Sequence, residues 1–143
     1  MSWIGANRAI SAIDWIEENR PENGEFIVYY LDGHNTVTLD INESVDKQIR
    51  WRMKFKNGKR ADGPSYGYYP EGNIKQIINW KDGEMDGHLV RFYPNGMVTD
   101  VFYFSKGIRD GYWYHKLPCG FLESEGEYIN GEQIWKKNYK KDA

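Results

Sequence analysis

The sequence predicts a mainly β protein: an elongated, single-sheet antiparallel meander of stacked hairpin repeats, about 24 residues each, with one N-terminal helix. One observation is a constant spacing of 24 residues between equivalent turn residues, such as Gly63, Gly87 and Gly111. A second is that aromatic residues make up 16% of the chain, a composition that favours sheet. Self-similarity at a fixed period of this size indicates a repeat architecture.

The same period holds in several independent columns of the sequence. They are the Asp-Gly pairs at 62–63, 86–87 and 110–111, the prolines Pro70, Pro94 and Pro118, and the glycines Gly72, Gly96 and Gly120. Asp-Gly favours the positive φ of tight hairpin turns, and Pro presets φ at the start of a turn. We therefore expect the recurring aspartates to be turn residues: Asp32, Asp62, Asp82, Asp86 and Asp110.

Between the turns, apolar residues alternate with period two, as in Ile78-Trp80 and Phe102-Phe104. This alternation is typical of strands with one buried face. Each repeat should therefore consist of two antiparallel strands and two turns.

The N-terminal segment, residues 1–24, contains an amphipathic pattern over 6–19 that predicts a helix ending at Pro21. Two roles are open for this helix. It could cap the first edge of the sheet or, because Trp3 and Trp15 are large, bind a partner.

Residues 25–56 predict a degenerate hairpin and a lead-in strand. The hairpin spans 25–42, turns at Asp32-Gly33, and is followed by a polar loop to Lys47. Tyr29-Tyr30 echoes Tyr68-Tyr69, so the hairpin resembles a decayed repeat unit. Residues 48–56 alternate without a break, and the cations of one side form a basic stripe: Arg50, Arg52, Lys54 and Lys56. The stripe is either a solvated face or a row that contacts a partner or anions, including lipid headgroups.

Residues 129–143 predict a capping edge strand with many lysines, which discourages pairing between sheet edges. The alternative is that these lysines contact phosphate.

The repeat resembles the MORN repeat family, and in particular its bacterial variant repeats. The resemblance lies in Trp80…Gly83…Gly87, in Phe104…Gly107…Gly111 and in the Tyr93-Pro94-Asn95-Gly96 turn. It covers about half of the chain, with three MORN-like repeats over 57–128. The third copy departs from the pattern at Leu117-Pro118-Cys119-Gly120, and a fourth fails at Trp135.

Composition sets limits on the class of protein. The 143 residues amount to a single domain, and the net charge of −2 argues against a nucleic-acid binder. Residues 1–50 carry four Lys/Arg against nine Asp/Glu, whereas 51–143 carry fifteen against twelve. One Cys, no signal peptide and no long apolar run lead us to expect a soluble cytoplasmic protein.

Functional candidates are positions at which the copies differ. Glu123, Glu125 and Glu127 replace uncharged or basic residues of the earlier copies and form an acidic ladder on one strand. Adjacent carboxylates repel one another, so they should either meet cations of a partner or pair with lysines of the last strand. Aromatic residues fall on both parities of their strands, and Tyr69, Tyr93 and Trp113 are candidate partner-binding anchors. The other reading is that they stack across strands.

The sequence nominates no catalytic residue, no metal ligand and no cofactor. The three histidines lack ligand spacing, and no base is positioned to activate Cys119. We therefore expect no enzymatic activity.

The expected function is protein binding by a repeat scaffold. The family resemblance implies a more specific role, that of an antitoxin or immunity protein that neutralises a cognate toxin by direct binding. Binding to an anionic membrane surface through the basic stripe, or a plain scaffold role, is the alternative. The sequence does not define the oligomeric state.

Overall fold

The computed structural model describes residues 19–31, 34–37 and 48–142, which form twelve strands in one antiparallel sheet. The strands are β1 (Gly24–Leu31), β2 (His34–Val37), β3 (Ile49–Lys56), β4 (Lys59–Arg60), β5 (Gly63–Tyr68), β6 (Ile74–Lys81), β7 (Glu84–Phe92), β8 (Val98–Ser105), β9 (Ile108–Arg109), β10 (Gly111–Lys116), β11 (Leu122–Ile129) and β12 (Glu132–Asn138). The helix predicted over 6–19, the turn at 32–33 and the loop at 42–47 lie outside the described residues, apart from Asn19.

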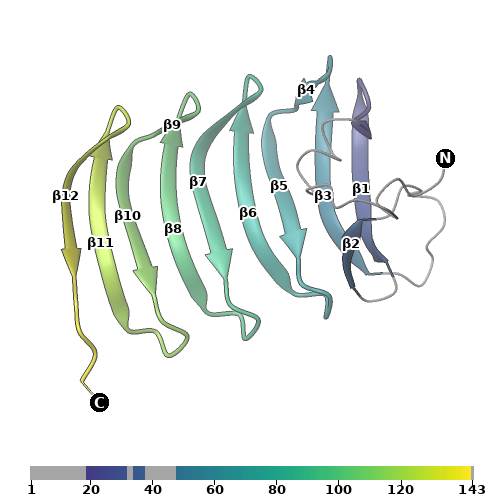
Figure 1. The fold of residues 1–143 in the computed structure, drawn as a ribbon. Coiled ribbons are helices and arrows are strands. Elements are labelled where there is room, and N and C mark those ends of the chain that lie inside the picture. The colour runs from purple at the N-terminus through teal and green to yellow at the C-terminus, as the bar shows by residue number, and fades with distance from the viewer. Residues whose placement is uncertain (1–18, 32–33, 38–47, 143) are drawn as a thin grey trace.

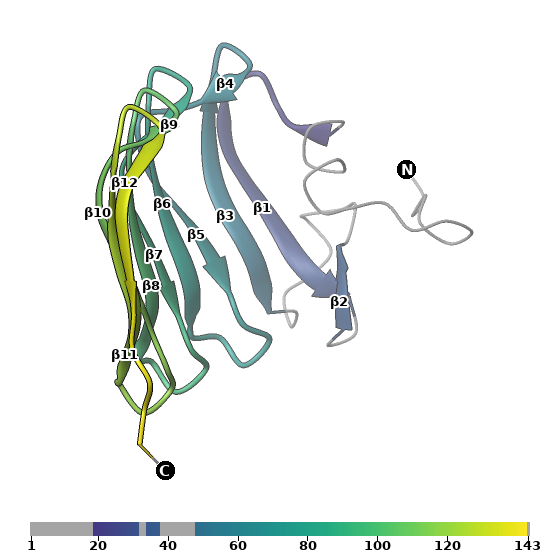
Figure 2. The same ribbon diagram turned by 60° about the vertical axis from the view of Figure 1, so that its left-hand side comes forward.

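From β3 onwards the strands follow the order of the chain, with the short strands β4 and β9 pairing with β3 and β8. Figure 1 shows the strands side by side in one row, and Figure 2 shows that β3 to β12 form a single curved layer. The prediction of a mainly β, antiparallel single sheet is therefore confirmed.

Four upper turns, at the top of Figure 1, reverse the chain after β3, β6, β8 and β11. Both central residues of each turn have positive φ, as type I′ hairpin turns require. These pairs are Asn57-Gly58, Asp82-Gly83, Lys106-Gly107 and Asn130-Gly131.

The Asp-Gly pairs at 62–63, 86–87 and 110–111 are not hairpin turns, so that prediction is wrong. Gly63, Gly87 and Gly111 pair within the sheet with Trp80, Phe104 and Tyr128. Their positive φ marks an irregularity in a strand and not a reversal of the chain.

The aspartates of these pairs instead connect successive repeats. Each carboxylate accepts a hydrogen bond from the first central N–H of the next upper turn. The three bonds are Asp82 N–H to Asp62 at 2.8 Å, Lys106 N–H to Asp86 at 3.1 Å and Asn130 N–H to Asp110 at 3.1 Å. The aspartates therefore serve the fold through contacts between repeats.

Three lower turns contain the prolines and connect β5 to β6, β7 to β8 and β10 to β11. Tyrosines at the start of these turns also link repeats. The Tyr69 hydroxyl donates to the carbonyl oxygen of Phe92 at 2.6 Å, and the Tyr93 hydroxyl donates to that of Lys116 at 2.8 Å. The third copy has Leu117 at this position and lacks the hydroxyl.

The N-terminal strands depart from a simple meander, because β1 lies between β2 and β3. β1 pairs with β2, as the predicted hairpin requires. On its other side β1 pairs with β3, so β2 lies at the edge of the sheet. The Tyr30 hydroxyl donates to the carbonyl oxygen of Tyr68 at 2.6 Å, which repeats the bonds of Tyr69 and Tyr93. β1 and β3 thus occupy the places that β5 and β6 occupy in the next repeat.

The buried residues lie on one face of the sheet, called the core face below. Cross-strand pairing places Phe26 beside Met53 and Leu89 beside Phe102, and Trp113 lies opposite Gly126. The buried apolar side chains are Phe26, Val28, Tyr30, Met53, Phe55, Leu89 and Trp113. The other side, called the outer face, carries pairs such as Tyr112 with Glu127 and Tyr114 with Glu125.

Candidate functional site

The middle residue of the acidic ladder, Glu125, is fixed by two tyrosines of neighbouring strands. It lies on β11 and accepts a hydrogen bond of 2.6 Å from the hydroxyl of Tyr112 on β10. The hydroxyl of Tyr139, just after β12, donates to the other carboxylate oxygen. The carboxylate is therefore held between the two strands that flank β11.

These bonds also set the charge of the cluster. The hydrogen bond from Tyr112, followed by that from Tyr139, lowers the pKa of Glu125 below its ordinary value. The hydrogen bond to Glu125 is the main cause that raises the pKa of Tyr112 to about 12. Near neutral pH the cluster therefore holds an ionised carboxylate and two neutral phenols.

Glu127 and exposed aromatic side chains continue the cluster across the outer face. The indole N–H of Trp135 donates to Glu127 at 3.1 Å, and the rings of Tyr112 and Tyr114 lie 6.0 Å apart. Tyr112 is 46% exposed and Trp135 is 40% exposed. This acidic–aromatic patch consists of Tyr112, Tyr114, Glu125, Glu127, Trp135 and Tyr139.

The ladder carboxylates thus bond to aromatic O–H and N–H groups of the neighbouring strands. The prediction that the ladder pairs with lysines of the last strand is met at Glu125. Lys137 lies opposite Glu125 on β12, and its charge contributes to lowering the pKa of Glu125.

Glu123 belongs to a different cluster. Its carboxylate lies 3.4 Å from Nε2 of His115, whose Nδ1 is 2.6 Å from Asp100. The imidazole therefore bridges carboxylates of β8 and β11 across β10.

The three predicted aromatic anchors do not form one exposed surface. Trp113 is only 8% exposed on the core face, where its indole N–H donates to Gln133, so its prediction as an exposed anchor is wrong. It is buried because Gly126 opposite leaves room for the indole ring. Tyr69 and Tyr93 are half-buried, and their hydroxyls are bonded within the sheet.

The basic stripe divides into two pairs. The guanidinium of Arg50 lies 5.5 Å from the ring centre of Tyr30, and burial lowers the pKa of Arg50. Arg52 contacts the Glu25 carboxylate at 3.4 Å. Lys54 and Lys56 are exposed and could contact an anion on the protein surface.

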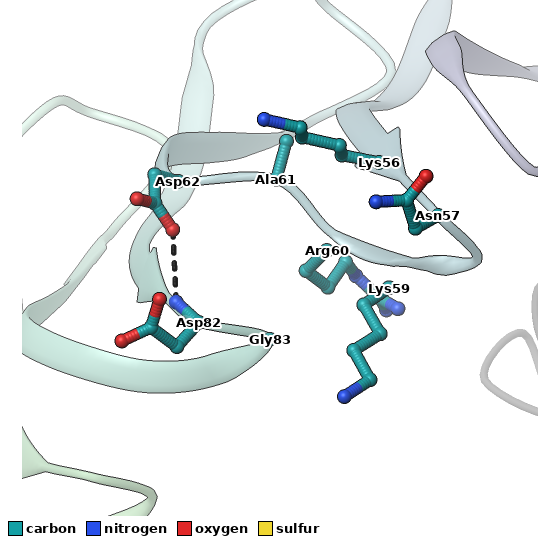
Figure 3. A pocket seen from close by; sticks show the side chains of 8 residues that line it. All are labelled: Lys56, Asn57, Lys59, Arg60, Ala61, Asp62, Asp82 and Gly83. Carbon is teal, nitrogen blue, oxygen red and sulfur yellow. Dashed lines mark hydrogen bonds between the residues drawn. The ribbon is translucent and has the colours of Figure 1, made fainter.

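A polar hollow of about 610 Å³ lies between two upper turns and is lined by Lys56, Asn57, Lys59, Arg60, Ala61, Asp62, Asp82 and Gly83. Figure 3 shows Lys59 and Arg60 below the first turn, Lys56 above it, and Asp62 bonded to the backbone of Asp82. This hollow, called the turn hollow, shares Lys59, Arg60 and Gly83 with a largely apolar pocket of about 490 Å³.

Sequence reasoning did not select Lys59 and Arg60, which line both the turn hollow and the apolar pocket. It also did not assign Trp135 and Tyr139 to the acidic ladder. A difference between copies was a usable signal for Lys59, because Glu84 and Ile108 take its place in the later copies. It was not one for Arg60, because Arg109 pairs with Phe104 as Arg60 pairs with Phe55.

The part of the chain that the structure describes contains no group of His, Cys, Asp and Glu suited to hold a metal ion. Cys119 is exposed, with its pKa lowered chiefly by a backbone hydrogen bond from Phe121. Among the described residues there is also no helix long and apolar enough to cross a membrane.

Comparison with curated proteins and with solved structures gives no match for this chain. Residues 61–82, which span β5, a lower turn and β6, match the family described as MORN repeat variant. This match falls on the first of the repeats that resembled MORN sequences, and it supports the MORN-like character of that repeat.

Proposed function

We propose that this chain is a non-enzymatic, cytoplasmic repeat protein that binds a basic partner protein through the acidic–aromatic patch. The partner would be a cognate toxin that the chain neutralises by direct binding. A MORN repeat suggests a binding or scaffold role, and this proposal makes that role specific.

One observation carries the proposal: the ionised Glu125 carboxylate is fixed in place beside exposed aromatic rings. Tyr112 and Tyr139 hold it, and Tyr112 and Trp135 are 46% and 40% exposed. Exposed Tyr and Trp are frequent interface anchors, because each supplies a large apolar area with a polar group at its edge. A fixed carboxylate beside them selects a cation and loses little conformational freedom when it binds.

The position of the patch favours a large partner. Its residues come from β10, from β11 and from the segment that begins at β12, and the strands among them are joined by continuous pairing. The acidic charges would attract a basic protein over distance and orient its approach. When a toxin is bound to the patch, the sheet would cover the active site of the toxin.

The test begins with capture of the tagged chain and its bound partner from source cells. The captured partner is then expressed in a host alone and together with the chain. We expect the partner alone to arrest growth, and co-expression to restore it. The double variant Glu125→Lys/Glu127→Lys should lose both binding and rescue.

Lys54→Glu/Lys56→Glu is the matched control, because it also reverses two exposed charges and leaves the patch intact. If the control loses rescue and the patch variant keeps it, the patch is not the binding surface. A chain that captures no protein but sediments with anionic vesicles, and does so less after Lys54→Glu/Lys56→Glu, would instead support the membrane-surface alternative.

A further inference from the structure

The last strand of the sheet, β12, has one paired edge and one open edge. It pairs with β11, and no other described strand pairs with its second edge. All seven residues of β12 are exposed, whereas β2, at the other end of the row in Figure 1, has only four residues. An open edge of this length presents unpaired backbone groups to which another strand can bind.

The register with β11 identifies the backbone groups at the open edge. The N–H of Tyr139 donates to the carbonyl oxygen of Glu123 at 2.8 Å, so Tyr139 bonds towards β11. In an antiparallel pair, residues that bond to the neighbouring strand alternate with residues whose N–H and C=O point away from it. The backbone groups of Asn138 and Lys136 are therefore turned outwards, and each residue offers one donor and one acceptor to an added strand.

The side chains of β12 differ between the two faces of the sheet. Trp135 lies opposite Glu127 on the outer face and is 40% exposed. Lys136 lies opposite Gly126 on the core face, with its Nζ 5.8 Å from the ring centre of Trp113. Directly opposed residues of neighbouring strands share a face. An added strand would therefore meet an aromatic ring on the outer face and a cation on the core face.

The charge along this edge favours an acidic strand. Residues 132–142 contain four lysines against two acidic residues, a net charge of +2. Lys137 lies opposite Glu125, which compensates part of its charge, but Lys136 has Gly126 opposite. Lysines at an edge repel another basic edge, including that of a second copy of this chain, and attract carboxylates. The four exposed lysines are Lys136, Lys137, Lys140 and Lys141.

The residue that joins one repeat to the next is missing at this edge. Asp62, Asp86 and Asp110 each accept a hydrogen bond from the following upper turn. The residue 24 positions after Asp110 is Ile134, which is 50% exposed and has no side-chain acceptor. The edge is therefore not built to continue the array with a further repeat, and a strand that binds here must be recognised through backbone and charge.

We propose that β12 binds an extended, acidic segment of a partner protein, which adds to the sheet as a further strand. Main-chain hydrogen bonds to Lys136 and Asn138 would supply affinity, and alternate side chains would supply selectivity. Acidic residues of the segment would lie beside Lys136 on the core face, and apolar residues would lie beside Trp135 on the outer face. The proposal does not rest on toxin binding, because it uses the backbone edge and not Glu125 or Glu127.

Two short peptides test the proposal on the unaltered chain. The probe is acetyl-Thr-Glu-Val-Glu-Val-Glu-Thr-amide, and the control peptide has Lys in place of each Glu. In NMR titrations of the isotope-labelled full chain, the probe should shift the amide signals of residues 132–141 and bind roughly tenfold or more tightly than the control. Amide exchange at Lys136 and Asn138 should slow. Equal affinity of the two peptides, or shifts centred elsewhere, would overturn the proposal.

N-methylated probes separate strand addition from attraction between charges. One version carries methyl groups on the glutamate amides and the other carries them on the valine amides. Only one of these sets faces β12 in an added strand, because successive amides point to opposite sides. One version should therefore bind about tenfold or more weakly, since it loses at least two hydrogen bonds, and the other should bind like the probe. Equal binding by both versions would contradict strand addition.

Asn138→Pro removes one outward N–H from the edge and keeps every lysine. Proline is tolerated on an edge strand where its N–H would face solvent, so the variant should fold. Its affinity for the probe should fall about fivefold, whereas Asn138→Ala, which keeps the N–H, should change it little. Circular dichroism and the thermal midpoint verify folding. Equal affinities of the two folded variants would contradict the proposed pairing.

A pair of charge variants tests the role of the lysines. Lys136→Glu/Lys140→Glu should weaken binding of the acidic probe at least tenfold, roughly the effect of two lost charge-assisted contacts. Lys54→Glu/Lys56→Glu is the matched control, because it reverses two exposed lysines of β3. An equal loss in the control would show that the probe responds to the net charge of the chain, which would overturn the site.

Discussion

Gly126→Ala is expected to be strongly destabilising, because a methyl group has no room at this position. A Cβ built on Gly126 would lie 2.6 Å from Nε1 of Trp113 and 2.6 Å from the backbone oxygen of Trp135. Ordinary contacts of a Cβ begin at 3.4 Å. Both distances must therefore increase by most of an ångström, and one of the two neighbours is backbone.

The magnitude follows from what has to move. Trp113 is 8% exposed and donates to Gln133 at 3.1 Å, so a shift of its ring loses that hydrogen bond and disturbs the packing around it. Overpacking costs about 1–3 kcal/mol. Loss of the hydrogen bond adds about 1 kcal/mol, so the free energy of unfolding should fall by about 2–4 kcal/mol.

The assay is urea unfolding followed by far-UV circular dichroism, on wild type, Gly126→Ala and Gly67→Ala. Gly67 is the matched control, because the three atoms nearest to its Cβ would all belong to side chains, the nearest being Cζ3 of Trp51 at 2.8 Å. Gly67→Ala should therefore cost less. A loss below about 0.5 kcal/mol at Gly126, the usual range for a surface substitution, would refute the packing argument.

Two further predictions concern single hydrogen bonds. Tyr93→Phe removes the 2.8 Å bond to the Lys116 carbonyl and should lower the free energy of unfolding by about 1 kcal/mol, whereas Tyr103→Phe, at a residue 36% exposed, should change it little. Equal effects in chemical denaturation would contradict this assignment. The pKa of Glu125 is lowered in the folded protein. Its contribution to the free energy of unfolding is therefore fully present above about pH 4.5, the ordinary pKa of Glu, and is lost as the pH falls through the pKa of Glu125 in the folded protein. The stability difference between wild type and Glu125→Gln should therefore shrink below that pH, and spectrophotometric titration should move the Tyr112 pKa from about 12 towards 10 in the variant. An unchanged tyrosine titration would show that Glu125 is not the cause of the shift.

Repetition made most of the sheet predictable from the sequence. Contacts between neighbouring repeats are local in the chain, so the period, the turn residues and the alternation of Ile78 and Trp80 were enough to predict antiparallel strands in chain order. The same repetition indicated that Asp62, Asp86 and Asp110 have a structural role. It could not show that Asp62 bonds to the turn of the next repeat, because this bond depends on the distance between a side chain and the backbone of another strand connection.

The functional surfaces were less predictable, because alternation assigns a residue to a face but does not show what covers that face. Trp113 and Tyr112 are adjacent in the sequence, yet one is buried over Gly126 and the other is exposed beside Glu125. The pairing of β10 and β12 with β11 decides this difference.

The sequence by itself determined the fold class, the order of the strands from β3 onwards and the turn at Asp82-Gly83, because these depend on local backbone preferences. Only the tertiary structure decided that β1 pairs with β3, that Tyr112 and Tyr139 hold Glu125, and that Lys59 and Arg60 border an apolar pocket. Each of these depends on the distances between side chains of different strands, which a pattern along one chain does not contain.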